Sequence, residues 1–166
     1  YLYSDLKTKF ERYISLVNEL AERQDKSIEF KILGEEILVD TNKYSDFINS
    51  SIHIFRNIVD HGIESIEERK QKGKEENGIL NVSFVLMEDK DKFKIIIEDD
   101  GQGIDHKKII DIASKNENFR HLKFDEMSKQ EAVNLIFEDS ISSKSNVDLI
   151  SGRGVGMKAL KKEIEK

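Results

Sequence analysis

Two short stretches of alternating apolar residues constrain the fold of this chain more than any other feature. The alternating positions are Leu80, Val82, Phe84 and Leu86 in the first stretch, and Phe93, Ile95 and Ile97 in the second. A period of two places such side chains on one face of a β-sheet. Both stretches are therefore predicted to be strands with one buried face.

The segments around these strands have helical periodicity. Residues 3–24 carry an apolar stripe, and a second helix is predicted to begin at Asp40 or Thr41 and to end at Gly62. Two further strands in "SIEFKIL" and "ILVD" suggest a hairpin. The charged segment 63–78 has room for one helical turn, and helices are expected near 106–114, near 128–137 and after 153.

This order of elements predicts an α+β fold, a two-layer sandwich with helices on one face of a mixed, mostly antiparallel sheet. With 166 residues, the chain is expected to form a single domain over 1–166. Its net charge of −6 argues against nucleic-acid binding. The longest apolar runs are too short for direct membrane insertion, and the absence of cysteine excludes thiolate chemistry.

The second helix carries the first candidate site, "HIFRNIVDHG". At 100° per residue, His53, Asn57, Asp60 and His61 fall within one polar arc opposite a broad apolar face. A solvated surface is the simplest interpretation, but the arc contains no Lys or Glu. Its groups suit a cation or a phosphate, and a zinc site formed by the two histidines and Asp60 is the alternative.

The second candidate site follows a predicted strand in "IIIEDDGQGID". The strand delivers Glu98, Asp99 and Asp100 to a loop that contains Gly101 and Gly103. A strand stopped by a turn would also have this composition.

A third candidate site is "SGRGVGMKAL", in which Gly152, Gly154 and Gly156 alternate directly before a helix. Backbone N–H groups at such a position can bind an anion without basic side chains.

Taken in order, the three motifs resemble those of the GHKL ATPases, and in detail the ATP-binding domain of chemotaxis-type, CheA-like histidine kinases. The resemblance extends from "LVNELAERQDKSIEF" to "SGRGVGMKALKK" and includes "EAVNLIFEDSISSK", which is similar to the lid of that domain. It implies that ATP and Mg²⁺ are the cofactors and that the chain is a protein-histidine kinase.

The resemblance also implies roles for individual residues. Asp99 would accept a hydrogen bond from the adenine amino group, Asn57 would bind Mg²⁺, and His53 would orient or deprotonate the attacking group. The remaining positions expected to line the nucleotide site are Asp60, His61, Gly101, Gly103, Lys108, Ser142, Ser143, Lys144, Gly152, Gly154, Gly156 and Met157.

The partners implied are a histidine-containing phosphoacceptor domain and, through it, a response regulator. Dimerisation would use domains outside this chain, and the location would be cytoplasmic. Because the chain ends at Lys166, the sheet is expected to lack the last two strands of that family.

Two alternatives stay open. Ile112 stands where a basic residue is expected, which together with the missing strands suggests a degenerate module that binds ATP and a partner without phosphotransfer. An ATP-hydrolysing dimer clamp would need a glutamate in place of His53.

Overall fold

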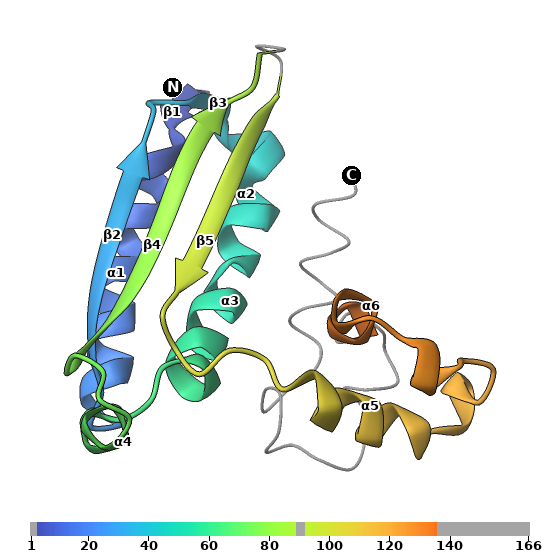
Figure 1. Cartoon of the computed structure of the whole chain (residues 1–166). Helices are drawn as coiled ribbons and strands as arrows, with labels where there is room; N and C mark the ends of the chain where they lie inside the picture. Colours follow the sequence, from blue (N-terminus) through green and yellow to red (C-terminus); the bar gives the residue numbers. More distant parts are fainter. Residues whose placement is uncertain (1–2, 89–91, 136–166) are drawn as a thin grey trace. The chain divides into compact units, whose positions relative to one another are not determined.

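A computed structural model describes residues 3–88 and 92–135 (Figure 1). The chain divides into two compact units, residues 1–102 and 103–166. The first unit combines a sheet with packed helices, and the described part of the second is a small helical cluster. The assignment of 1–166 to a single domain stays a prediction.

The first unit begins with a short strand and ends with the strand that carries Asp99. Its elements are β1 (Tyr3–Asp5), α1 (Leu6–Glu22), β2 (Ser27–Gly34), β3 (Leu38–Asp40), α2 (Thr41–Ser50), α3 (Ile52–Asn57), the π-helical turn η1 (Ile58–Gly62), α4 (Ile66–Gln71), β4 (Asn77–Leu86) and β5 (Phe93–Asp99). The helix predicted from Asp40 to Gly62 is present as α2, α3 and η1. Asp40 is its N-cap, because the Asp40 carboxylate accepts a hydrogen bond from the Asn42 N–H at 2.9 Å.

The main sheet has the strand order β2-β4-β5, with β2 parallel and β5 antiparallel to β4. A separate ribbon pairs β1 with β3 in antiparallel orientation. Helices α1, α2 and α3 lie along one face of the main sheet (Figure 1). The predicted α+β class, with helices on one face of a mixed sheet, is confirmed.

The predicted hairpin between β2 and β3 is wrong. β2 pairs with β4, placing Phe30 opposite Leu80, whereas β3 pairs with β1. The chain leaves the sheet at Gly34, and the Glu35 N–H donates to the Phe84 carbonyl at 2.9 Å. Local alternation identified both strands, but the partner of β2 lies about fifty residues further along the chain.

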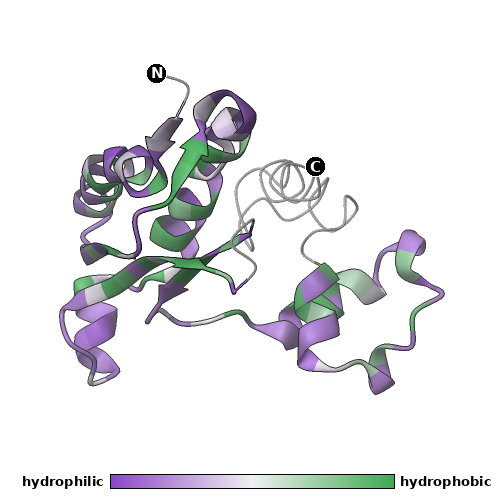
Figure 2. Ribbon diagram, turned by 90° about the horizontal axis from the view of Figure 1, so that it is seen from above, coloured by the Kyte–Doolittle hydropathy of each residue, from purple (hydrophilic) through white to green (hydrophobic). Residues whose placement is uncertain are grey.

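The core of the first unit lies between the sheet and the helices, where apolar residues gather (Figure 2). Phe10 of α1 is the centre of an aromatic group. Its ring centroid lies 5.3 Å from that of Phe84 on β4 and 6.1 Å from that of Phe55 on α3. Edge-to-face contacts of this kind add about 0.5–1.5 kcal/mol each to the burial of the rings. They fix α3 against the sheet.

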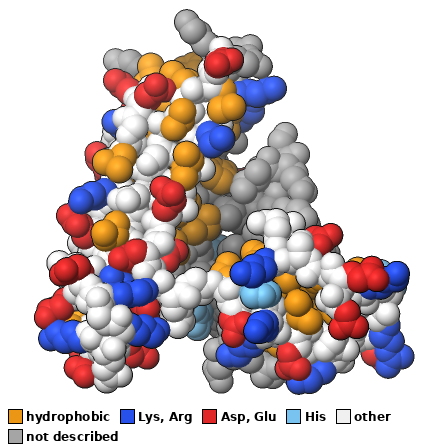
Figure 3. Space-filling model, viewed as in Figure 1, with side chains coloured by type: hydrophobic (Ala, Val, Ile, Leu, Met, Phe, Trp, Pro, Cys, Tyr) orange, Lys and Arg blue, Asp and Glu red, His pale blue; other side chains and the backbone are white. Residues whose placement is uncertain are grey.

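The opposite face of the main sheet carries charged side chains of both signs among scattered apolar ones (Figure 3). Leu33, Ile79 and Val85 are its exposed large apolar residues. Among the residues the structure describes, no helix has the length and apolar character needed to cross a membrane.

The second unit consists, within its described residues, of short helices around Ile109, Ala113, Phe119 and Leu135. They are α5 (His106–Ser114), η2 (Glu117–Phe119), η3 (Phe124–Glu126) and α6 (Lys129–Asn134). The helices expected near 106–114 and 128–137 are confirmed. The helix expected after 153 lies outside the described residues.

Candidate functional site

His53 and Asn57 lie one turn apart on α3, so their side chains share a face of that helix. His53 is exposed and Asn57 is half-buried. Within residues 3–88 and 92–135, neither side chain has a hydrogen-bond partner. The opposite side of α3 is fixed by Phe55, which is fully buried. α3 is therefore anchored by Phe55, and it presents an imidazole and an amide that have no hydrogen-bond partner in the described part of the chain.

The helix changes geometry directly after Asn57. η1 is π-helical, and the Ile63 N–H donates to the Ile58 carbonyl five residues earlier at 2.8 Å. Such turns are rare and concentrate at functional sites. The spacing of 100° per residue therefore ends at Asn57, and the predicted four-residue arc holds strictly only for His53 and Asn57.

The loop after α1 supports this turn. Gln24 Nε2 donates to Asp60 Oδ1 at 2.6 Å, and the Lys26 ammonium donates to the carbonyls of Val59 and Asp60. Burial lowers the pKa of Lys26, and the Asp60 carboxylate partly opposes that shift. Asp60 thus has a structural partner, while the half-buried His61 side chain has none among the described residues.

Asp99 ends β5, opposite Leu80 of β4. Its Oδ1 accepts a hydrogen bond from the Gly101 N–H at 2.9 Å. No hydrogen bond to Asp99 Oδ2 is present among residues 3–88 and 92–135, and the residue is exposed. A Cβ built on Gly62 would lie 3.7 Å from Asp99 Oδ1. The carboxylate therefore lies beside the end of the helical segment that carries His53 and Asn57.

The glycine loop is joined directly to the end of η1. The Gln102 N–H donates to the Gly62 carbonyl at 2.9 Å, and Gln102 Nε2 donates to the His61 carbonyl at 2.6 Å. A Cβ on Gly101 would lie 2.1 Å from the Gly62 carbonyl oxygen. Only glycine permits this approach, which brings the two sequence motifs together.

We expect Gly101→Ala to lower the free energy of unfolding by about 3 kcal/mol or more, because the new methyl group must displace backbone. Urea denaturation measures the loss. Gly73→Ala is the matched control in the same unit. Gly73 has φ 69° and no atom within 4 Å of a built Cβ, so alanine there costs only local strain of about 1–2 kcal/mol. Equal losses in the two variants would contradict the close approach.

The Asp100 carboxylate has hydrogen-bond partners within the first unit. It accepts hydrogen bonds from Arg69 Nη2 at 2.8 Å and from the Ile79 N–H at 2.8 Å. Burial opposes ionisation of Asp100, but the hydrogen bonds from Arg69 and the Ile79 N–H hold its pKa below the ordinary value.

Sequence reasoning missed Glu64, Arg69 and Lys74, which surround Asp100. They lie in the segment 63–78, which was predicted to be a charged connection with room for one helical turn and in which the structure has α4. The one available signal was a capping box, in which Ser65 and Glu68 exchange hydrogen bonds at the start of α4. That pattern locates a helix, but it does not reveal that an arginine inside the helix is buried.

Two of the other predicted site residues lie in the described part of the second unit, and seven lie outside the described residues. Gly103 and Lys108 are exposed and belong to the second unit. Seven of the predicted positions lie outside the described residues and stay predictions: Ser142, Ser143, Lys144, Gly152, Gly154, Gly156 and Met157. Among the described residues, no group of three His, Asp or Glu side chains could hold a metal ion.

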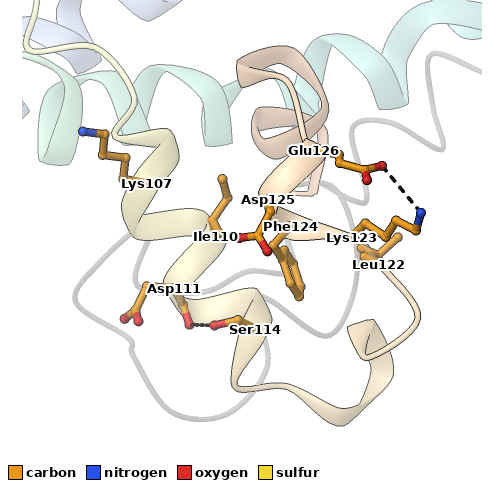
Figure 4. A pocket seen from close by; sticks show the side chains of 9 residues that line it. All are labelled: Lys107, Ile110, Asp111, Ser114, Leu122, Lys123, Phe124, Asp125 and Glu126. Carbon is orange, nitrogen blue, oxygen red and sulfur yellow. Dashed lines mark hydrogen bonds and ion pairs between the residues drawn. The ribbon is translucent and has the colours of Figure 1, made fainter.

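The second unit has an open hollow of about 620 Å³ (Figure 4). Ile110, Leu122 and Phe124 provide its apolar surface, and Lys107, Lys123, Asp111, Asp125 and Glu126 provide charges of both signs. It includes none of the predicted nucleotide-binding residues.

The fold and this site can be compared with known proteins. No protein-family model matches the chain. A gliding motility regulatory protein of Myxococcus xanthus is 34% identical over 160 residues, which cover 96% of this chain and 20% of that protein. The sensor histidine kinase CheAY of Helicobacter pylori is 37% identical over 157 residues, covering 95% of this chain and 19% of that protein.

The chemotaxis protein CheA of Bacillus subtilis is 32% identical over 160 residues, covering 96% of this chain and 24% of that protein. The chain thus spans about a fifth of the length of the curated relatives it matches. Nearly all of it is similar to one segment of CheA-type chemotaxis proteins. The predicted resemblance to CheA-type proteins is therefore confirmed at the level of sequence similarity.

Proposed function

We propose that this chain binds ATP with Mg²⁺ and donates the γ-phosphoryl group to a histidine on a separate phosphoacceptor domain. The observation that carries the proposal is the position of Asp99. Its carboxylate is anchored through Oδ1, has no described partner at Oδ2, and lies beside the end of the helical segment bearing Asn57. The similarity to chemotaxis proteins and to a sensor histidine kinase supports the same reading.

In this proposal, Asp99 Oδ2 accepts a hydrogen bond from the exocyclic amine of adenine. The base would lie against the backbone of the glycine loop. Recognition of an amino group by a carboxylate discriminates against bases without that donor, since a base that covered the carboxylate would leave the acceptor unpaired.

Asn57 is the residue that would hold Mg²⁺. Its amide has no hydrogen-bond partner among the described residues, and a single neutral oxygen fits a metal that retains several waters and takes few protein ligands. When bound, the ion neutralises charge on the phosphates. His53, one turn away, orients or deprotonates the attacking imidazole of the acceptor. The new bond forms between the γ-phosphorus and the attacking imidazole nitrogen. The bond from that phosphorus to the β,γ-bridging oxygen breaks, and ADP leaves.

The proposed setting is two-component, chemotaxis-like signalling. The phosphorylated histidine would pass its phosphoryl group to a response regulator. Dimerisation would use parts of the assembly outside residues 1–166, and the location would be cytoplasmic.

A degenerate module of the same fold is the second candidate. Ile112, half-buried on α5, places an apolar side chain where the CheA-like pattern has a basic one. Such a module would bind ATP and a partner without transferring phosphate.

The test has two stages. Calorimetric titration of the chain with ADP, with and without Mg²⁺, measures nucleotide binding. Labelling with γ-³²P-ATP, in the presence of a histidine phosphoacceptor domain from a CheA-type protein, then measures transfer. Labelling of the acceptor supports the kinase, binding without labelling supports the degenerate module, and absence of binding overturns both.

We expect His53→Gln to leave ADP affinity within about twofold of the wild type and to slow transfer about 10²–10⁴-fold, the range of a general base. The side chain is exposed, so the fold should be unaffected. His121→Gln is the matched control, because it removes an exposed imidazole from the second unit. Unchanged transfer by His53→Gln would remove His53 from the mechanism.

A further inference from the structure

A buried group of charges lies behind the glycine loop. Glu64 and Arg69 are 4% and 1% exposed. Arg69 Nη1 donates to Glu64 Oε2 at 3.2 Å, and Nη2 donates to Asp100 Oδ2 at 2.8 Å. Nη1 also donates to Asp100 Oδ1 at 3.3 Å, while Nε and Nη2 donate to the carbonyls of Glu75 and Asn77. Such complete pairing is what allows an arginine to be buried.

Lys74 connects this group to the loop itself. Its ammonium donates to Glu64 Oε1 at 2.8 Å, to the Asp100 carbonyl at 2.9 Å and to the Gly101 carbonyl at 2.9 Å. All three ammonium protons therefore have acceptors. One of the three hydrogen bonds goes to the buried Glu64 carboxylate, and the other two go to backbone carbonyls of the glycine loop.

The peptide group between Asp100 and Gly101 connects Lys74 to Asp99 through two hydrogen bonds. The carbonyl of that peptide accepts from Lys74, and its N–H donates to Asp99 Oδ1. A trans peptide is planar, so its carbonyl and N–H point in opposite directions and cannot rotate independently. Fixing the carbonyl therefore fixes the direction in which the N–H holds the Asp99 carboxylate.

We infer that Lys74, anchored on Glu64 and Arg69, is a positioning residue for the base-recognising carboxylate of Asp99. This inference rests on the proposed nucleotide site and adds a determinant of base selectivity to it. Lys74 acts through the loop peptide: it sets where Oδ2 lies, and hence how well the site separates a base with an amino group from one with a carbonyl.

The variant that tests this is Lys74→Met, which keeps the length of the aliphatic chain and removes the three donors. Lys72→Met is the matched control. Lys72 also donates to Glu64 Oε1, at 3.3 Å, but within residues 3–88 and 92–135 its ammonium makes no hydrogen bond to a carbonyl of the glycine loop. Lys74→Arg restores the charge and the donors.

Calorimetry with ADP and with IDP, which presents a carbonyl where ADP has the amine, measures selectivity. Lys74→Met is expected to weaken ADP binding about tenfold and IDP binding little, whereas Lys72→Met keeps the wild-type ratio and Lys74→Arg recovers most of it. An equal loss for both nucleotides, or no loss, would overturn the inference. In an Asp99→Asn background, Lys74→Met should have no further effect on ADP affinity.

Amide hydrogen exchange gives a readout that needs no nucleotide. In the free chain, the Gly101 N–H should exchange about tenfold faster in Lys74→Met than in the wild type or Lys72→Met, because its acceptor geometry is no longer fixed. Unchanged exchange defeats the positioning role even if the chain binds ADP. Faster exchange in a chain that does not bind ADP supports the loop mechanism and rejects the proposed function.

Discussion

Asp99→Asn is expected to reduce the affinity for ADP by about 100-fold or more. The substitution replaces a carboxylate oxygen that accepts from the adenine amine with a group that presents either a weaker acceptor or an N–H donor. Hydrogen bonds to charged groups contribute about 1.5–3 kcal/mol, and a donor facing a donor adds a further penalty. Since 1.4 kcal/mol is a factor of ten, calorimetric titration resolves the loss easily.

The fold should tolerate this change. An asparagine at position 99 can still accept the Gly101 N–H through its Oδ1, so the loop keeps its hydrogen bond. Glu98→Gln is the control, because it neutralises the neighbouring exposed acid on β5. It should leave ADP affinity unchanged. If Asp99→Asn bound ADP like the wild type, Asp99 would have no role in recognising the base, and the match of this loop to the CheA-like glycine box would be wrong.

Glu64→Gln is expected to lower the free energy of unfolding by about 3–5 kcal/mol at pH 7, the usual result of removing one partner from a buried ion pair. The amide leaves the Arg69 guanidinium and the Lys74 ammonium without the anionic partner that they share. Urea denaturation measures the difference. Glu67→Gln on the exposed face of α4 should change stability by no more than about 0.5 kcal/mol.

The pH dependence of that difference checks its cause. Burial alone would raise the pKa of Glu64, but hydrogen bonds from Lys74, its own backbone and Lys72 lower it from 4.5 to about 2. Between pH 4.5 and about 2, the Glu64 carboxylate therefore stays ionised in the folded state, whereas it binds a proton in the unfolded chain. The stabilisation is complete above pH 4.5 and is lost as pH falls from 4.5 towards 2. Wild type and Glu64→Gln should converge over that interval, and a constant gap would assign the effect to packing.

The sequence predicted the parts of this molecule that depend on local patterns. Alternation identified β4 and β5, the helical stripe identified α1, and Asp40 and Gly62 marked the limits of the helical segment that contains Asn57. The similarity to CheA-type proteins was also visible, because His53, Asn57, Asp99 and Gly101 stand in an ordered set of motifs.

Pairings between distant segments were not predictable in the same way. The alternation in β2 does not specify which strand it pairs with, and β3 is the nearest candidate along the chain. In the structure β2 pairs with β4, and Phe30 and Ile32 pack against the core between the sheet and the helices. The π-helical geometry of η1 likewise depends on Gln24 and Lys26, which approach from the end of α1.

The sequence by itself determined which residues are candidates for the chemistry. The residue types and their spacing along one segment are enough to place an acid before glycines or an amide on a helix face. Only the tertiary structure decided that Glu64, Arg69 and Lys74 form the support of the Asp99 loop. Their charge predicts exposure, and burial of Glu64 and Arg69 becomes favourable only when every donor has an acceptor. Asp100 and Gly101, which supply several of these acceptors, lie in a segment that is remote along the chain.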